Sequence, residues 1–195
     1  AIDTLNPERT QYTDAGLCRE EYSYQVVAIN PEHRYQSWSK PAAQVPEYNY
    51  PTFRHSLTNS TIKGGQLVTT WEQPATWTPS SYTIQRKTTG TDNYQTVAED
   101  VKAQQYIDST AKVADQAYQY RIEALDHCST PSANYGFSSS VHLKAEASQQ
   151  NIDLAWESAK DWSRDVSSYK VQVKKQGAGF ETIASVPGDQ TAYQD

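Results

Sequence analysis

One unit of sequence recurs along this chain, and the recurrence limits the possible folds more than any other feature. Trp71 and the run 81–87 (SYTIQRK) reappear as Trp156 and the run 168–174 (SYKVQVK). A pattern that returns after roughly 90 residues indicates one structural module used several times in tandem.

Two further blocks locate the other copies of the unit. The run 22–29 (YSYQVVAI) matches the run 118–125 (YQYRIEAL), and a Tyr-x-Asp signature ends at Asp14, Asp108 and Asp195. Only the middle copy contains every block. We therefore divide the chain into three repeats, which are the C-terminal half of a module at 1–45, a complete module at 52–143 and the N-terminal part of a third module at 144–195.

The two partial repeats are short for independent domains. A segment of about 45 residues buries too little apolar surface to fold alone. The chain also begins at Ala1 and contains no methionine. We expect a processed or partial chain whose natural polypeptide continues at both ends.

Side chains within the module alternate with a period of two residues. In the run 22–29, we expect Tyr22, Tyr24, Val26 and Ala28 to share the buried face, and the matching run of the second repeat has the same alternation. Short alternating runs separated by Gly, Pro, Asn and Asp are typical of half-buried antiparallel strands.

Seven such runs fit into the complete repeat. The expected strands are 53–59, 66–71, 81–87, 94–98, 104–108, 117–125 and 137–143. Gly64-Gly65 is expected to form the hairpin turn between the first two strands. Seven short strands in roughly 90 residues predict an all-β, seven-stranded antiparallel sandwich.

Residues at fixed positions of these strands resemble fibronectin type III domains. The second and third repeats each have a Trp at the end of the second strand, Trp71 or Trp156, and a Tyr on the third strand, Tyr82 or Tyr169. The resemblance covers essentially the whole chain. It implies tandem fibronectin type III-like, immunoglobulin-like sandwiches.

A second part of the resemblance lies at the start of the sixth strand. Leu17 precedes Tyr22 by five residues, and the pattern continues as Tyr-x-Tyr-x-Val-x-Ala. The resemblance implies that Tyr22 and Tyr118 are tyrosine-corner residues, whose hydroxyl groups bond to the backbone before this strand. The Tyr-x-Asp pattern and the run 124–128 also resemble repeats of large Bacteroidetes surface proteins. Those proteins often end in gliding-motility-associated, type IX secretion sorting domains.

Composition narrows the range of partners. The net charge is −6 and the charges are scattered, which argues against nucleic-acid binding. The sequence shows no signal-peptide pattern and no apolar run long enough to cross a membrane. We expect the partners to be other domains of the same larger protein, with other surface proteins or glycans as further candidates.

The residues that catalysis or cofactor binding requires do not occur in suitable patterns. His33, His55, His127 and His142 lack zinc-like spacing, and we expect them to face solvent in loops. The glycines are dispersed, and no serine lies in a nucleophile-elbow motif. The sequence therefore predicts a chain that is not an enzyme and carries no cofactor or metal.

Aromatic side chains are the remaining candidates for binding. Trp38, Tyr50, Trp77 and Trp162 are of a type that stacks on sugars or packs on a partner protein. Because Trp77 and Trp162 occupy one position of the repeat, we favour a packing role for both. We expect Trp38 in the last strand of the first repeat and Tyr50 in the linker that follows it.

The only two cysteines, Cys18 and Cys128, are expected at facing ends of neighbouring modules. In a sandwich of this type, the turn before the sixth strand lies where the chain leaves the module, and the loop after that strand lies where the chain enters. Cys18 falls in the first place and Cys128 in the second, which predicts an inter-domain disulfide and an oxidising compartment. Two buried free thiols, or two cysteines that each lack a same-domain partner, are the alternatives.

Three short motifs mark candidate glycosylation sites. Asn59 begins an Asn-x-Ser/Thr sequon. Thr4 and Ser109 lie in three-residue runs that resemble the O-glycosylation motif of exported Bacteroidetes proteins.

Three functions agree with these features. The first, which we favour, is a non-catalytic extracellular segment that serves as a spacer or stalk. Its parent would be a large, secreted, adhesin-like bacterial surface protein of the gliding-motility-associated type. The second is an accessory region of a secreted multidomain enzyme such as a glycoside hydrolase. The third is a ligand-binding, receptor-type ectodomain that binds between the first and second repeats.

Overall fold

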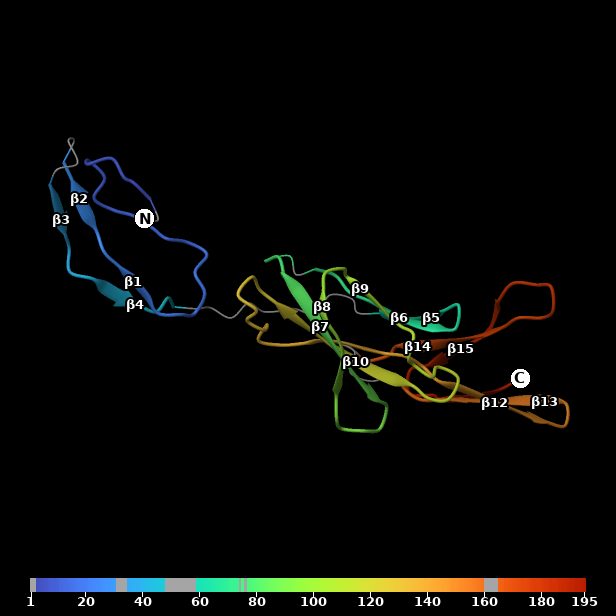
Figure 1. Ribbon diagram of the computed structural model, residues 1–195. Coiled ribbons are helices and arrows are strands. Elements are labelled where there is room, and N and C mark those ends of the chain that lie inside the picture. The colour runs from blue at the N-terminus through green and yellow to red at the C-terminus, as the bar shows by residue number, and fades with distance from the viewer. Residues whose placement is uncertain (1–2, 31–34, 48–58, 74, 76, 160–164) are drawn as a thin grey trace. The chain divides into compact units, whose positions relative to one another are not determined.

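All regular structure in the described part of the chain is β-strand. The computed structural model describes residues 3–30, 35–47, 59–73, 75, 77–159 and 165–195. Every strand pair among them is antiparallel (Figure 1). None of these residues belongs to a helix that is long and apolar enough to cross a membrane.

The chain separates into two compact units. The N-terminal unit is Ala1–Asn49 and the C-terminal unit is Tyr50–Asp195.

The second repeat folds as a two-layer sandwich. One sheet has the strand order β11-β10-β7-β8 and the other has the order β5-β6-β9. The first sheet consists of β7 (Ser81–Thr88), β8 (Gln95–Val101), β10 (Tyr118–Leu125) and β11 (Gly136–Ser139). The second consists of β5 (Asn59–Lys63), β6 (Gln66–Thr70) and β9 (Gln105–Asp108). This arrangement confirms the predicted seven-stranded antiparallel sandwich.

The hairpin turn at Gly64-Gly65 is confirmed, but the strand before it was misplaced. The two glycines have φ angles of 56° and 79°, in the left-handed region that a tight hairpin requires. β5 begins at Asn59, the last residue of the predicted strand. It continues to Lys63, and every residue from Asn59 to Lys63 pairs with β6. The rest of that predicted strand, 53–58, lies outside the described residues.

The end of the last strand was also misplaced. The prediction extends it to residue 143, whereas β11 ends at Ser139. Leu143 instead pairs with Trp156 in the third repeat. Period-two alternation cannot show this boundary, because the chain remains extended on both sides of it.

The core of the second repeat draws side chains from both sheets. It comprises Leu67, Trp71, Tyr82, Ile84, Tyr118, Tyr120, Ile122 and Ala124. Half of these side chains come from β10, where they are spaced by two residues as predicted. The rings of Trp71 and Tyr82 meet edge to face with centroids 5.1 Å apart, the arrangement that aromatic pairs prefer.

A chain of hydroxyl groups joins the first and last strands of this sandwich. Ser60 Oγ on β5 lies 2.7 Å from Ser138 Oγ on β11 and 2.9 Å from Thr69 Oγ1 on β6. Ser138 and Thr69 are fully buried. Because each hydroxyl has a partner, the edge of the core contains these polar groups without a desolvation penalty.

The third repeat reproduces the first five strands of the second. β12 (Leu143–Ser148), β13 (Asn151–Trp156) and β16 (Ala192–Gln194) form one sheet. β14 (Ser168–Val173) pairs with β15 (Glu181–Pro187) in the other (Figure 1). Trp156 meets Tyr169 edge to face at 5.4 Å, which repeats the Trp71–Tyr82 contact.

The strand next to the third one is irregular in both repeats. The β7–β8 register shifts on either side of Ile84, and the β14–β15 register shifts between Val171 and Gln172. Such bulges interrupt the hydrogen-bond ladder and increase the local twist.

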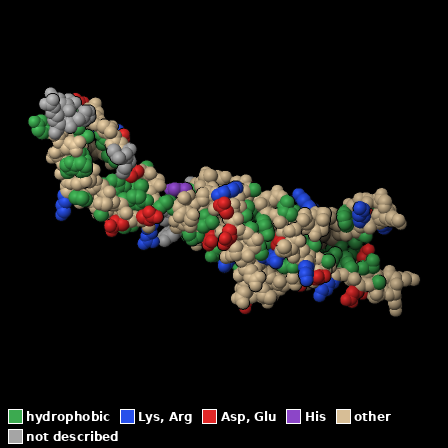
Figure 2. Space-filling model, viewed as in Figure 1, with side chains coloured by type: hydrophobic (Ala, Val, Ile, Leu, Met, Phe, Trp, Pro, Cys, Tyr) green, Lys and Arg blue, Asp and Glu red, His purple; other side chains and the backbone are tan. Residues whose placement is uncertain are grey.

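The N-terminal unit contains one interrupted hairpin. β1 (Tyr22–Tyr24) pairs with β4 (Ala42–Gln44), and β2 (Val27–Ile29) pairs with β3 (Gln36–Trp38). None of the described residues of this unit is buried. Figure 2 shows hydrophobic side chains on its surface.

The predicted buried face of this hairpin is only half correct. Tyr22 and Tyr24 are half-buried, but Val26 is 71% exposed and Ala28 is also exposed. The strand breaks at Gln25-Val26, and a break of this kind moves the following residues to the opposite face.

Both predicted tyrosine corners are present. The hydroxyl of Tyr118 accepts hydrogen bonds from the Lys112 backbone N–H at 2.9 Å and from Gln116 Nε2 at 2.7 Å. The hydroxyl of Tyr22 accepts one from the Cys18 backbone N–H at 3.2 Å. Each tyrosine thereby fixes the turn that leads into the sixth strand of its module.

The hairpin turns provide a direct test of backbone strain. Gln149 occupies the turn position of the third repeat that Gly64 occupies in the second, and its φ is 54°. A left-handed backbone costs a non-glycine residue about 1 kcal/mol. Gln149→Gly should therefore stabilise the β12–β13 hairpin by up to about 1 kcal/mol, and Gly64→Gln should destabilise the β5–β6 hairpin similarly.

Hydrogen–deuterium exchange of the two hairpins measures both effects. Slower exchange is expected in β12–β13 of Gln149→Gly and faster exchange in β5–β6 of Gly64→Gln. Unchanged exchange in both variants would contradict the assignment of strain to these positions.

Candidate functional site

The most densely bonded polar group of the second repeat is the carboxylate of Asp108, at the end of β9. Its side chain is fully buried. Oδ2 accepts hydrogen bonds from Arg86 Nη1 at 2.6 Å and from the Tyr120 hydroxyl at 2.7 Å. Oδ1 accepts from the backbone N–H and the hydroxyl of Thr110, at 2.9 and 2.8 Å. These contacts connect β9, β7 and β10, and therefore both sheets.

These hydrogen bonds also determine the protonation states of Asp108 and Tyr120. Burial alone would raise the pKa of Asp108, but hydrogen bonds from Tyr120, Thr110 and Arg86 outweigh burial and hold that pKa below its usual range. Burial, followed by the carboxylate of Asp108, raises the pKa of Tyr120 well above its usual range. At neutral pH the carboxylate is therefore ionised and the phenol protonated. With four donors on two oxygens and no exposed surface, Asp108 is placed to anchor strands rather than to accept a substrate proton.

The first repeat contains a counterpart of this contact. Tyr24 corresponds to Tyr120, and its hydroxyl donates to Asp14 Oδ2 at 3.0 Å. Asp14 and Asp108 are both the last residue of the Tyr-x-Asp signature. The signature thus marks the acceptor for the second tyrosine of the sixth strand, a role that sequence spacing alone did not reveal.

A row of aromatic and cationic side chains covers the outer face of the four-stranded sheet. The guanidinium of Arg121 lies 4.7 Å from the ring centroid of Tyr94 and 4.4 Å from that of Tyr135. Arg121 Nε also donates to Gln85 Oε1, and Lys87 Nζ lies 4.9 Å from the Tyr94 ring. We call Arg121, Tyr94, Tyr135, Gln85 and Lys87 the outer ladder. It extends from the segment before β8 across β7 and β10 to the segment before β11.

The outer ladder could not be predicted from the sequence. The period-two pattern marks Gln85, Lys87 and Arg121 only as polar positions on the outer face. Their mutual contact depends on the pairing of β7 with β10, which brings together residues that are 36 apart in sequence, such as Arg121 and Gln85.

Neither cysteine is a free thiol, because both Cys18 and Cys128 are disulfide-bonded. The predicted participation of both cysteines in disulfide bonding is confirmed, and the alternative of two free thiols is excluded. Cys18 lies at the tyrosine corner of the first repeat, where its N–H bonds to Tyr22. In the loop after β10, Asp126 Oδ1 accepts the backbone N–H groups of Cys128 and Thr130, each at 2.8 Å. Both cysteines are thus held by hydrogen-bonded turns.

The aromatic residues proposed for binding have different surroundings. Trp77 is half-buried and packs against the core of the second repeat. Trp38 lies in β3 and is 61% exposed. Tyr50 and Trp162 lie outside the described residues.

The candidate glycosylation sites are all accessible. Thr4, Asn59 and Ser109 are exposed, and Asn59 is the first residue of β5. An exposed side chain is a requirement for glycan attachment to a folded domain.

The histidine expectation is wrong for His142. This side chain is buried, and its Nε2 lies 2.9 Å from the carbonyl oxygen of Ala114. Its own carbonyl accepts the backbone N–H of Glu157 at 3.3 Å, so His142 contacts both the second and third repeats. His127 is exposed as expected, whereas His33 and His55 lie outside the described residues.

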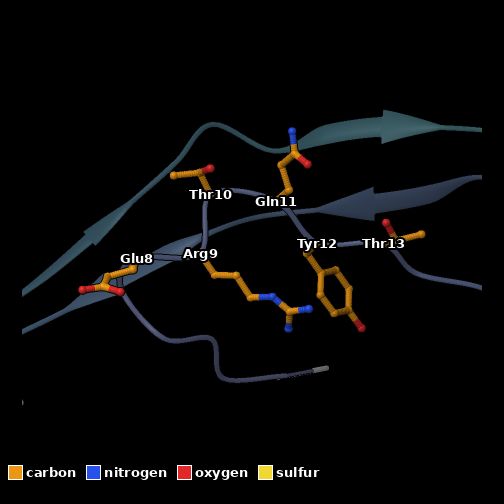
Figure 3. A pocket seen from close by; sticks show the side chains of 6 residues that line it. All are labelled: Glu8, Arg9, Thr10, Gln11, Tyr12 and Thr13. Carbon is orange, nitrogen blue, oxygen red and sulfur yellow. The ribbon is translucent and has the colours of Figure 1, made fainter.

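A surface pocket in the N-terminal unit has no features of a built site. It is lined by six consecutive residues, Glu8, Arg9, Thr10, Gln11, Tyr12 and Thr13, all of them exposed. In Figure 3, Arg9 and Tyr12 point to one side of the segment, and Thr10 and Gln11 point to the other. The side chains therefore do not converge on a common ligand position.

The Asp108 contacts predict that stability depends on pH. Because its folded pKa lies below the unfolded value of about 3.9, its stabilisation is complete above that value and is lost as pH falls through the folded pKa. Asp108→Asn should lower the free energy of unfolding at pH 7 by roughly 3 kcal/mol, because Arg86 loses its buried partner. The variant should also lose less stability on acidification than the wild type.

Urea denaturation between pH 7 and pH 2.5 measures this difference. Asp153→Asn is the matched control, because hydrogen bonds from Ser148 and Gln194 also hold its pKa low, but its site is open to solvent. Its effect should be much smaller. Equal effects of the two variants would argue against the anchoring role of Asp108.

The outer ladder predicts an effect of Arg121 that a surface charge would not have. Arg121→Ala should cost about 1–2 kcal/mol of stability, because it removes two stacked aromatic contacts and the bond to Gln85. Arg121→Lys should be intermediate, since an ammonium group lacks the planar face. Lys87→Ala is the control, with one contact only, and chemical denaturation compares all three. A cost no larger than that of the control would contradict the ladder.

Comparison with known proteins adds a set of distant structural neighbours. No protein-family model matches the chain, and no curated protein matches it. An Fn3-like protein from Clostridium thermocellum is 17% identical with a TM-score of 0.36, over 46% of this chain and 88% of that one. The chicken CNTN1 FN1-FN3 domains are 13% identical with a TM-score of 0.37, over 88% of this chain and 66% of that one. A two fibronectin type-III domain segment from chicken tenascin is 14% identical with a TM-score of 0.33, over 75% and 82% of the respective chains. The strand order of the second repeat, rather than these scores, gives the chain its fibronectin type III-like fold.

Proposed function

We propose that this chain is a non-catalytic extracellular spacer, a row of modules that holds other domains of a larger protein at a distance. One observation supports the proposal: the buried or bonded polar groups of the first and second repeats hold strands and turns together. The buried carboxylate at Asp108 has its hydrogen bonds filled by the module itself, and Asp14 repeats the contact. Tyrosine corners at Tyr22 and Tyr118 fix the same turn in two repeats.

We infer that Cys18 and Cys128 form the disulfide with each other. The chain has two cysteines and both are bonded. A covalent link between the first and second repeats would limit bending at their junction, as a spacer requires. It also favours an extracellular or cell-surface location, where disulfides persist.

The closer biological assignment rests on the resemblance of the repeat to Bacteroidetes surface proteins. We place the chain in a large, secreted, adhesin-like protein of the gliding-motility-associated, type IX secreted kind, with other domains of that protein as its partners. An accessory role beside the catalytic domain of a secreted enzyme is supported by the same fold. The residues before and after this segment in its parent protein distinguish the two.

One observation favours a second candidate function, that of a ligand-binding ectodomain. Trp38 exposes 61% of its surface on β3, where its ring is available to a sugar or protein partner. A glycan array or pull-down that loses signal with Trp38→Ala, but keeps it with Trp77→Ala, would support this candidate over the spacer.

The spacer proposal predicts a defined response to force. With the disulfide reduced, the second repeat should unfold in one cooperative event when the chain is stretched by its ends. With the disulfide intact, the roughly 110 residues between Cys18 and Cys128 cannot extend, so reduction should add roughly 370 Å of extended length. Atomic-force or optical-trap extension with and without reductant measures both quantities. Extension of the reduced chain without a force peak would count against a mechanical role.

The disulfide pairing has its own test. Mass spectrometry of a non-reduced digest should yield one peptide pair that contains Cys18 and Cys128. Two separate peptides with free or externally capped thiols would overturn the pairing and leave the fold unaffected.

A further inference from the structure

The outer ladder of the second repeat contains a cation whose hydrogen-bonding capacity is only partly used. The guanidinium of Arg121 lies over the rings of Tyr94 and Tyr135, and its Nε donates to Gln85 Oε1. Its two terminal nitrogens have no acceptor among the described residues. Two aromatic contacts and one hydrogen bond therefore fix the position of the guanidinium and leave its terminal N–H groups open.

No carboxylate of the described chain neutralises this part of the surface. Neither Arg121 nor Lys87 forms an ion pair with a described residue. Lys87 on β7 is opposite the residue two before Arg121, and Glu123, the acidic residue of β10, is two after it on the same face. The two cations are thus adjacent, and Glu123 lies on the side of Arg121 away from Lys87.

The outer ladder is accessible to a ligand. All five of its side chains are partly exposed. They lie on the face of β7 and β10 opposite to the core, and these two strands are the inner strands of their sheet. A ligand on this face therefore contacts the ladder without disturbing the packing beneath it.

Two contacts of the outer face recur in the third repeat. Lys174 Nζ lies 5.9 Å from the ring centroid of Phe180, at the position of the lysine–tyrosine contact of the second repeat. Gln172 Nε2 donates to Thr182 Oγ1 at 3.2 Å, and the corresponding bond of the second repeat measures 3.4 Å. Both contacts lie within β14, β15 and the turn between them, so they do not require any further strand. A cation beside an aromatic ring is therefore a feature of the outer face in both modules.

We propose that the outer ladder binds an acidic polysaccharide through the carboxylate or sulfate groups of its sugars. A guanidinium presents paired N–H donors that match two oxygens of either group, and Arg121 holds such donors open at the surface. Lys87 adds a second positive charge beside it. The partly exposed rings of Tyr94 and Tyr135 supply apolar surface for the sugar rings.

The recurrence favours a polymer over a small anion as the ligand. A polysaccharide that carries a negative charge on each sugar matches a cationic site that returns from module to module, and linked contacts raise the overall affinity. The net charge of −6 disfavours a nucleic acid, because dense phosphate charge requires a broadly basic surface. This binding is additional to the spacer function and does not depend on it, since a spacer requires only the fold.

Isothermal titration calorimetry of the full chain tests the binding with three probes. Oligogalacturonate carries carboxylates, sulfated dextran carries sulfates, and unmodified dextran is neutral. At least one acidic probe should bind, with an affinity that falls as salt is added, because salt screens exposed charges. Neutral dextran should not bind. The acidic probe with the higher affinity identifies which of the two groups the ladder prefers.

Variants that keep the fold locate the site. Arg121→Lys retains the charge but loses the paired donors, and it should weaken binding about fivefold. Lys87→Gln should weaken binding about threefold, the effect of one exposed charge pair. Lys63→Gln is the matched control, because it removes one exposed positive charge from β5 on the opposite sheet, and its effect should be less than about twofold. Circular dichroism establishes that each variant is folded.

Nuclear magnetic resonance maps the contact independently of affinity. Addition of the acidic probe should shift backbone amide resonances of β7 and β10 in the second repeat, whereas those of β5, β6 and β9 should not move.

Four results would overturn the proposal. The first is that neither acidic probe binds at up to about 10 mM, and the second is that neutral dextran binds as tightly as the acidic probes. The third is that Lys63→Gln weakens binding as much as Lys87→Gln, which would indicate general attraction of anions. The fourth is that single-stranded oligothymidylate binds more tightly than either acidic saccharide, which would indicate a nucleic-acid ligand.

Discussion

The pairing of β7 with β10 is the constraint on which the rest of the sandwich depends. It is the longest uninterrupted ladder in the second repeat, and the inward side chains of β10 supply half of the core. Tyr118 at one end of β10 fixes the preceding turn, and Tyr120 reaches Asp108 on the other sheet. Arg121 holds the outer ladder on the opposite face. A single strand thus connects the core, the corner, the buried charge and the outer surface.

Much of this arrangement could be predicted because it is encoded locally. Alternation over the run 118–125 gave both the strand and its buried face. The Gly64-Gly65 pair gave a hairpin, since few other residues adopt the backbone that the turn requires. The residues that carry the resemblance, Trp71 with Tyr82 and Trp156 with Tyr169, meet in pairs with the same edge-to-face geometry, although the sequence predicted only their positions and not their contact.

What could not be predicted depends on residues that are distant in sequence. Burial of Asp108 beside Arg86 requires β9 of one sheet to lie over β7 of the other, which no spacing reveals. His142 is buried because it lies between the ends of two modules, although a polar residue after a strand normally indicates a loop. The break at Val26 has a different cause, which is the lack of a neighbouring strand. There the local pattern is that of β10, but the strand that would hold it flat is absent from the described part of the N-terminal unit.

The bulges beside β7 and β14 have a consequence for a chain built of repeated modules. Similar modules in one chain are present at a high local concentration of one another, and a regular edge strand in one module could pair with an edge strand of its neighbour. In both repeats the strand at that border shifts register within its pairing, and a twisted, irregular border offers a poor template. The second and third repeats therefore both have, at the same position, a border strand that discourages strand addition between neighbouring modules.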